Sequence, residues 1–204
     1  MVSVKILVEG RTDELVAKRL LNHVGLEVGT VYRRKGKHDL LKRLTNYNKA
    51  AYFEPWFVVV DLDMDTKCPS QALVQWLPNP ARGMRFRIAV RAIEAWLMAD
   101  RENMARFLGV ASSRIQHNID LDSNPKETLI NIARSSRNRN IREDLVPRQM
   151  SGAKVGPLYV SQLTKFVEEL WRPDVAANES ESLRRCISAL STLTSWDIQA
   201  IITP

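Results

Sequence analysis

The chain has 204 residues, of which 45% are apolar and 26% are charged, and these proportions are ordinary for a globular domain. No segment approaches the roughly 20 apolar residues of a membrane span, and the two cysteines and three histidines form no zinc-binding pattern. The N-terminus leads directly into a strand, so we expect no signal peptide and a cytoplasmic location.

The first sixty residues alternate short apolar runs with amphipathic segments. A strand ending at Val8 precedes a helix that we expect to be capped by Thr12 and to run to about Val24. A second strand over residues 28–32, a basic helix over residues 37–50 and a third strand over residues 57–61 follow.

The same alternation continues to about residue 108. A helix begins near Pro69 and ends at Trp76, before two prolines. Residues 84–90 alternate arginine with apolar side chains, which is typical of a half-buried strand near the edge of a sheet. The period then changes, and we expect one helix over residues 91–108.

The pattern changes again after Gly109. We expect irregular structure over residues 110–125, a helix over residues 125–135, an arginine- and asparagine-rich stretch, and an ordered loop over residues 147–158. Two helices, about 159–171 and 180–193, follow. The sequence predicts an α/β fold, a mostly parallel sheet flanked by helices over residues 1–109, with a C-terminal helical lobe over residues 110–204 packed on it.

Acidic residues stand where two of the expected strands end. Glu9 follows the first strand, and Asp61, Asp63 and Asp65 follow the third. The carboxyl ends of parallel strands are where open α/β folds bind ligands, and strand alternation would direct Asp61 and Asp63 to the same side. Carboxylates brought together repel one another unless a cation neutralises them, and oxygen ligands of this kind favour Mg²⁺ or Mn²⁺.

The net charge of +7 is distributed unevenly. Basic side chains are dense in residues 31–49, in residues 82–91 and in residues 134–148. Basic segments around an acidic centre suit a polyanion, although each cluster alone also fits a solvated surface. The candidates for contact with a nucleic acid are Arg33, Arg34, Lys35, Arg85, Arg87 and Arg91.

The acidic run after the third strand has competing interpretations. A calcium loop counted from Asp61 would have Thr66 in place of glycine and Ala72 in place of glutamate, so that interpretation fails. A haloacid-dehalogenase-type phosphohydrolase fits the apolar strand followed by Asp61 and Asp63, but that family has Thr or Val where Asp65 stands. The acids could also simply cap the strand and the following helix.

The combination of motifs resembles a TOPRIM domain, the metal-binding module of topoisomerases, primases and related nucleases. The matching segments are Val-Glu-Gly-Arg-Thr-Asp at residues 8–13 and Asp-Leu-Asp at residues 61–63, within about residues 3–95. Residues 91–97, Arg-Ala-Ile-Glu-Ala-Trp-Leu, resemble a segment of small bacterial TOPRIM-like proteins. That group is related to the overcoming-lysogenization-defect nucleases and to RloB-like abortive-infection proteins, and extends the resemblance to about residue 108.

The resemblance implies a nuclease that cleaves phosphodiester bonds of DNA or RNA with Mg²⁺ or Mn²⁺, in the setting of bacterial defence against phage. Glu9, Asp61 and Asp63 would hold the metal. Asp65 or Glu94 could add a second metal, although Glu94 could equally pair with a basic side chain. Glu9 is alternatively a general base, and Lys154, in a glycine-flanked loop, is a catalytic candidate that would offset charge in the transition state.

Two other functions stay open at this point. The chain could be a non-catalytic TOPRIM adaptor that binds nucleic acid or an ATPase, or a phosphohydrolase of small molecules. It has no Walker phosphate-binding loop, so any ATPase partner would be a separate polypeptide.

Overall fold

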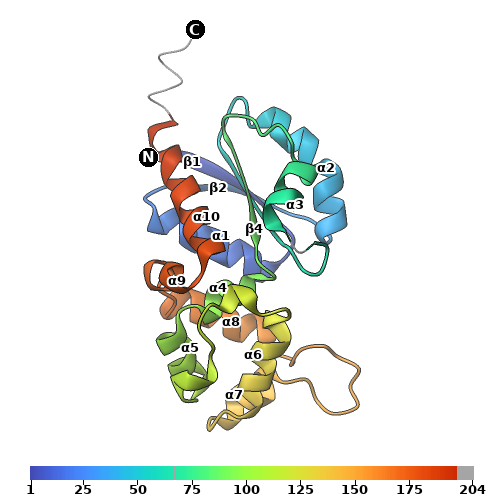
Figure 1. The fold of residues 1–204 in the computed structure, drawn as a ribbon, viewed down its shortest axis with the longest axis vertical. Coiled ribbons are helices and arrows are strands. Elements are labelled where there is room, and N and C mark those ends of the chain that lie inside the picture. Colours follow the sequence, from blue (N-terminus) through green and yellow to red (C-terminus); the bar gives the residue numbers. More distant parts are fainter. Residues whose placement is uncertain (67, 197–204) are drawn as a thin grey trace.

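The computed structural model describes residues 1–66 and 68–196, and its sheet has four parallel strands in the order β2-β1-β3-β4 (Figure 1). This confirms the expected α/β fold and places β4 at an edge. The strands are β1 (Ser3–Val8), β2 (Glu27–Arg33), β3 (Trp56–Asp61) and β4 (Met84–Ala89). The helices are α1 (Arg11–His23), α2 (Lys37–Ala50), α3 (Pro69–Trp76), α4 (Ile93–Met98), α5 (Arg101–Leu108), α6 (Pro125–Arg134), α7 (Arg139–Leu145), α8 (Tyr159–Glu169), α9 (Pro173–Glu179) and α10 (Glu181–Ser191).

The register of the sheet brings the acidic strand ends to one edge. Ile6 of β1 lies beside Phe57 of β3, and Asp61, the last residue of β3, lies beside Ala89 of β4. Because all pairs are parallel, the residues that follow β1, β3 and β4 emerge together at the carboxyl edge.

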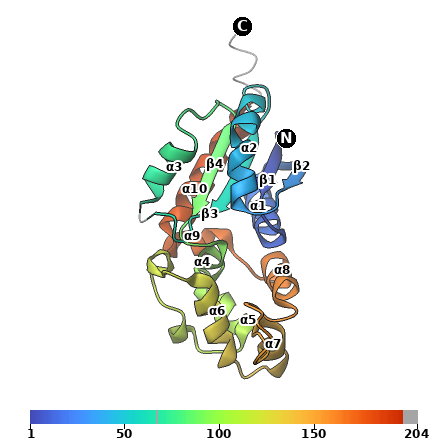
Figure 2. The ribbon, with the colours of Figure 1, turned by 90° about the vertical axis from the view of Figure 1, so that its right-hand side faces the viewer.

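Helices cover both faces of the sheet (Figure 2). Side chains alternate along each strand, so Ile6 and Phe57 join the core on the side of α1 and α10, whereas Leu7 and Val58 join the core beneath α2 and α3. The central strands β1 and β3 are mostly apolar on both faces for this reason, as buried parallel strands usually are.

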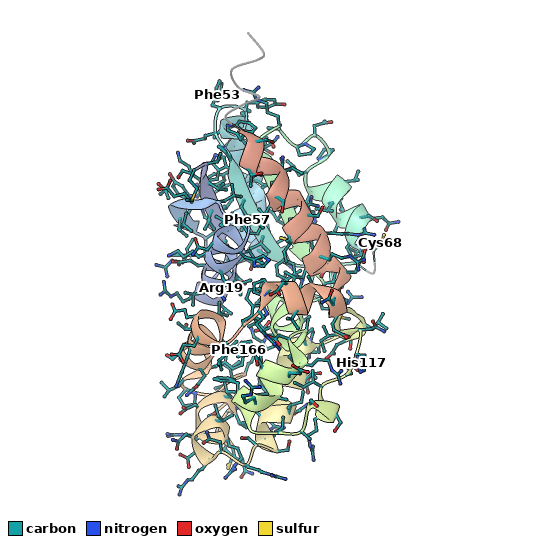
Figure 3. All side chains as sticks on the ribbon, turned by 90° about the vertical axis from the view of Figure 1, so that its left-hand side faces the viewer. Arg19, Phe53, Phe57, Cys68, His117 and Phe166 are labelled. Carbon is teal, nitrogen blue, oxygen red and sulfur yellow. The ribbon has the colours of Figure 1, made fainter. Side chains whose placement is uncertain are left out.

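A helical half lies beyond the carboxyl edge and holds α4 to α9, while α10 returns to pack on β4 (Figure 1). Its interior is continuous with the core on the α1 side. Figure 3 labels Phe57 in the sheet and Phe166 of α8 in the helical half, and both belong to this single core. The helical half and the sheet therefore share one hydrophobic core. A division into two domains at residue 109 stays a prediction.

The expected helix over residues 91–108 is wrong in one respect, because it breaks into α4 and α5 at Asp100. Asp100 is fully buried and accepts hydrogen bonds from the Arg172 backbone N (3.0 Å), Nε (3.1 Å) and Nη2 (2.7 Å). Asp100 also caps the start of α5, so a local cap and a partner distant in the sequence both favour the break. The short helix α7 forms where only an irregular stretch was expected, and α1 begins at Arg11 with Gly10 as its cap in place of Thr12.

Other expectations hold. Ser180 caps the last long helix by accepting a hydrogen bond from the Leu183 N–H at 3.2 Å, and residues 147–158 form a loop. In the described part of the chain, no helix combines the length and the apolar character that crossing a bilayer requires.

The shared core makes truncation informative. A chain ending at Gly109 should aggregate or unfold, because it exposes large side chains of the common core that Phe166, Trp171 and Leu163 cover in the full chain. Burial of each such side chain contributes about 1.5–3 kcal/mol, a large share of the stability of a domain. Circular dichroism and thermal melting of residues 1–109 and of the full chain check this. A soluble fragment that melts like the full chain would contradict it.

Candidate functional site

Two carboxylates mark the centre of the carboxyl edge. Glu9 follows β1 directly, and Asp61 ends β3, the neighbouring strand. The Asp61 Oδ1 atom accepts a hydrogen bond from the Ile93 N–H at 2.8 Å, so the start of α4 is attached to the end of β3. This contact places Glu94, in the first turn of α4, close to Asp61.

Glu94 is almost fully buried, with 3% of its surface exposed. Its Oε1 atom accepts a hydrogen bond from the Tyr159 hydroxyl at 2.9 Å, and the Lys126 Nζ lies 3.6 Å away. The Oε2 atom is buried without a hydrogen-bond partner. Burial, followed by the negative charge of Glu94, raises the pKa of Tyr159, so the phenol remains a donor.

Burial and neighbouring negative charges disfavour ionisation of Asp61 and Asp13. Burial, followed by the charges of Asp13 and Glu94, holds the pKa of Asp61 well above its ordinary range. Asp13, whose Oδ2 atom accepts from the Gly10 N–H at 2.7 Å, also has a raised pKa, chiefly through burial. We call Glu9, Asp13, Asp61 and Glu94 the acidic cluster.

Glu9 is partly buried, and within the described residues one of its carboxylate oxygens lacks a hydrogen-bond partner. Burial, then the charge of Asp13, raises its pKa from 4.5 to about 7, with Lys37 opposing the shift. The Oε1 atom has no hydrogen-bond partner although it is inaccessible to water. Unpaired buried carboxylate oxygens are costly, and they are the kind of atom that a cation would satisfy.

Asp63 and Asp65 lie differently from the expectation. β3 ends at Asp61 and Asp63 has φ 50°, so strand alternation does not reach Asp63 and cannot align it with Asp61. Both side chains are exposed and paired with Lys37, whose Nζ contacts the Asp63 Oδ2 and lies 2.8 Å from the Asp65 Oδ2. Lys37 also donates to the backbone oxygen of Asp61 at 3.0 Å. This lysine thus bridges the two outer acids and offsets part of their charge.

A hollow of about 400 Å³ opens beside the acidic cluster, between the sheet and the helical half. Asp61 and Asp63 line one side, and residues 123–126, including Lys126, line the other. Arg91 is also in its wall and donates to the backbone oxygens of Asp63 (2.9 Å) and Thr66 (2.8 Å). Of the six predicted nucleic-acid contacts, Arg91 is the one that lines this hollow.

The other predicted basic residues have different surroundings. Arg33 pairs with Glu14 at 3.2 Å, Arg34 donates to the Tyr47 hydroxyl, and Lys35 is exposed. Arg85 lies near the amino end of β4 and donates to the Ala189 oxygen (3.0 Å) and the Thr192 Oγ1 (2.8 Å), which attaches it to the end of α10. Arg87 lines a small hollow between α3 and α10.

Lys154 is exposed in the loop between α7 and α8 and lines a second hollow, of about 470 Å³, with Lys126 and Arg134. It does not line the hollow beside Asp61. The structure thus brings Glu9, Asp61 and Glu94 together and leaves Lys154 apart from them.

Sequence reasoning missed Asp13, Lys37, Lys126 and Tyr159 as members of the site. Signals existed for two of them. Asp13 belongs to the first motif, and Lys37 opens the helix after the second strand, so it must also lie at the carboxyl edge. Tyr159 and Lys126 come from the helical half, whose docking no local pattern specifies.

Across residues 1–66 and 68–196, no group of three or more His, Cys, Asp and Glu side chains is arranged to hold a metal ion. Comparisons with protein-family models, curated proteins and solved structures found no match.

The raised pKa of Glu9 predicts how stability depends on pH. A carboxyl whose pKa is higher in the folded state stabilises the protein fully below its unfolded value, here 4.5, and this stabilisation is lost as the pH rises through about 7. Glu9→Gln should remove this component, worth about 1–2 kcal/mol for a half-buried group, and flatten the decline over that interval.

Urea unfolding across this pH range, in chelator, provides the measurement. Glu27→Gln, the same change at an exposed position of β2, is the matched control and should follow the wild type. Parallel curves for wild type and Glu9→Gln would mean that Glu9 ionises normally.

Proposed function

We propose that this protein is a divalent-metal-dependent nuclease that cleaves phosphodiester bonds with Mg²⁺ or Mn²⁺. The observation that supports it best is the acidic cluster itself, at the carboxyl edge, with the Glu9 Oε1 and Glu94 Oε2 atoms buried and unpaired. A chain that kept these acids for stability alone would be expected to satisfy those oxygens with hydrogen-bond donors.

The donor set fits a hard cation. Glu9 and Asp61 would be its principal ligands, with Asp13 and Glu94 able to contribute, because all four supply only carboxylate oxygens. Since no three of the described side chains already converge for a metal, binding would require side-chain rotation. Within the described residues the Glu9 Oε1 atom has no hydrogen bond to lose in such a rotation.

The cation would supply Lewis acidity toward the phosphate and a lower pKa for the attacking water. The chain's own residues would do the rest. Glu9, with a pKa of about 7, is balanced between its charged and neutral forms near neutral pH and could act as a general base if it is not a ligand. Arg91 and Lys126, on opposite sides of the hollow, would hold the phosphate by charge.

A second function, a non-catalytic binding module, is favoured by one observation. Lys37 pairs with both Asp63 and Asp65, so these two acids already have a basic partner in place of a metal. In that case the basic side chains around the hollow would bind nucleic acid without cleaving it. Bacterial defence remains a proposal that follows from the TOPRIM resemblance.

Cleavage of labelled DNA and RNA in Mn²⁺ or Mg²⁺ tests the nuclease. The wild type should cut at least one of them, chelator should abolish cutting, and Asp61→Asn should lower the rate by about a hundredfold or more, because it removes a ligand. Asp39→Asn, the same change on α2 where Asp39 pairs with Arg43 at 2.9 Å, is the matched control and should retain activity.

Calorimetric titration with Mn²⁺ gives an independent reading. Binding should be measurable in the wild type and in Asp39→Asn, and strongly weakened in Asp61→Asn. Equal Mn²⁺ binding by all three proteins would reject the metal centre. Binding of nucleic acid without cleavage would favour the non-catalytic module, and turnover of a generic phosphomonoester would favour a phosphohydrolase.

A further inference from the structure

We propose that a basic groove on the helical half binds the phosphodiester backbone of nucleic acid and guides it to the acidic cluster. The inference rests on the proposed function for the identity of the ligand. Its basis is a series of hollows that share walls, all on one side of α6 and α7.

The hollows follow one another away from Asp61. The first, about 400 Å³, shares Asn124 and Lys126 with the second, about 470 Å³. The second shares Arg134 and Pro147 with a third, about 460 Å³. We call the second and third hollows together the lobe groove. The shared residues place it next to the hollow at the acidic cluster.

Most of the charged side chains that line the lobe groove are basic. Its cations are Lys126, Arg134, Arg142, Arg148 and Lys154. Within the described chain, the last four of these form no ion pair with a carboxylate: Arg134 donates to the neutral Asn131 Oδ1 at 3.0 Å, and Arg142 to the Ser136 backbone oxygen.

The two acids in the walls of the lobe groove have partners of their own. Glu143 pairs with Arg139 at 2.6 Å, and Glu127 accepts from the Asn124 Nδ2 at 2.7 Å. The five cations outnumber these two acids, so the potential of the lobe groove is positive.

The shape and the lining favour a chain of phosphates. Hollows of this size in series exceed what one small anion needs. The residues that line them include no aromatic side chain, so bases would have no surface on which to stack. Contact through phosphates alone predicts binding that depends strongly on salt and weakly on base sequence.

The path proposed for the nucleic acid therefore runs along the lobe groove and not along the basic residues that the sequence suggested. Arg33, Arg34 and Arg85 donate to Glu14, Tyr47 and Thr192. Within the described residues, the side chains of Arg148 and Lys154 in the lobe groove have no such partner, and Arg134 and Arg142 donate only to neutral oxygens. Lys126 joins both parts, since it lines the first two hollows and approaches Glu94. A backbone bound in the lobe groove would pass Lys126 before reaching Asp61.

The test measures binding without cleavage. The full-length protein is titrated, in chelator and at several salt concentrations, into labelled duplex DNA and duplex RNA of the same sequence. The triple variant Arg134→Gln, Arg148→Gln, Lys154→Gln should bind at least one of them about tenfold or more weakly, and its log–log salt slope should fall by about one per lost contact. A second base sequence should give the same affinities.

A matched control keeps the result specific. Arg106→Gln, Lys49→Gln, Lys165→Gln removes the same charge from exposed positions outside the lobe groove and should bind like the wild type. Thermal melting shows whether each triple variant is folded, and the single reversal Lys154→Glu, in an exposed loop, repeats the test if the triple variant is not.

Two outcomes would overturn the lobe groove: equal salt slopes for the groove variant and the wild type, or equal weakening by both triple variants. Because chelator is present, these outcomes are separate from the nuclease proposal. Loss of binding in the groove variant alone, with no cleavage in Mn²⁺ by the wild type, would support the lobe groove and reject the nuclease.

Discussion

The parallel pairing of β1 with β3 is the constraint on which the rest of the site depends. Glu9 follows the last residue of β1, and Asp61 is the last residue of β3. The parallel pairing brings both strand ends to the same edge, so Glu9 and Asp61 become neighbours. The Asp61 carboxylate then accepts from the Ile93 N–H, which fixes the start of α4 and with it Glu94. One register therefore sets the positions of acids from three separate segments and the point at which the helical half begins.

The carboxylates at this edge of the sheet differ in how many basic or hydrogen-bonding partners they have. Lys37 pairs with Asp63 and Asp65, and Tyr159 donates to one oxygen of Glu94. Within the described residues, the Glu9 Oε1 and Glu94 Oε2 atoms have no donor. Replacement of such a site by apolar residues is often neutral or stabilising, so retention of unpaired carboxylates is poorly explained by stability. The contrast between the satisfied outer acids and the unsatisfied inner ones directs attention to Glu9 and Asp61 as the chemically important pair.

Local pattern was sufficient for the sheet but not for the helical half. Apolar runs that end in acid predicted β1 and β3 and the edge where Glu9 and Asp61 meet, because burial on both faces leaves a clear signal. The alternation of strands and helices predicted the mostly parallel sheet. The break at Asp100 combines a local N-cap contact with Asn103, which is a sequence signal, and a distant partner, Arg172, which is not. β3 ends at Asp61, so Asp63 is no longer in a strand conformation and does not follow the expected alternation. Arg85 donates hydrogen bonds to the end of α10 and the turn after it. Residues positioned by distant partners carry no local signature.

The opposite charges of the lobe groove and the acidic cluster give the helical half a reason to be attached to the sheet. A polyanion would be attracted to Arg134, Arg148 and Lys154 but repelled on reaching Asp61. Lys126 stands at the junction, 3.6 Å from Glu94 and in the walls of both parts, and one ammonium group cannot neutralise four carboxylates. A divalent cation at the acidic cluster would offset much of this negative charge and lower the repulsion of the polyanion. In this view metal and nucleic acid would bind with positive coupling, each removing a repulsion that opposes the other.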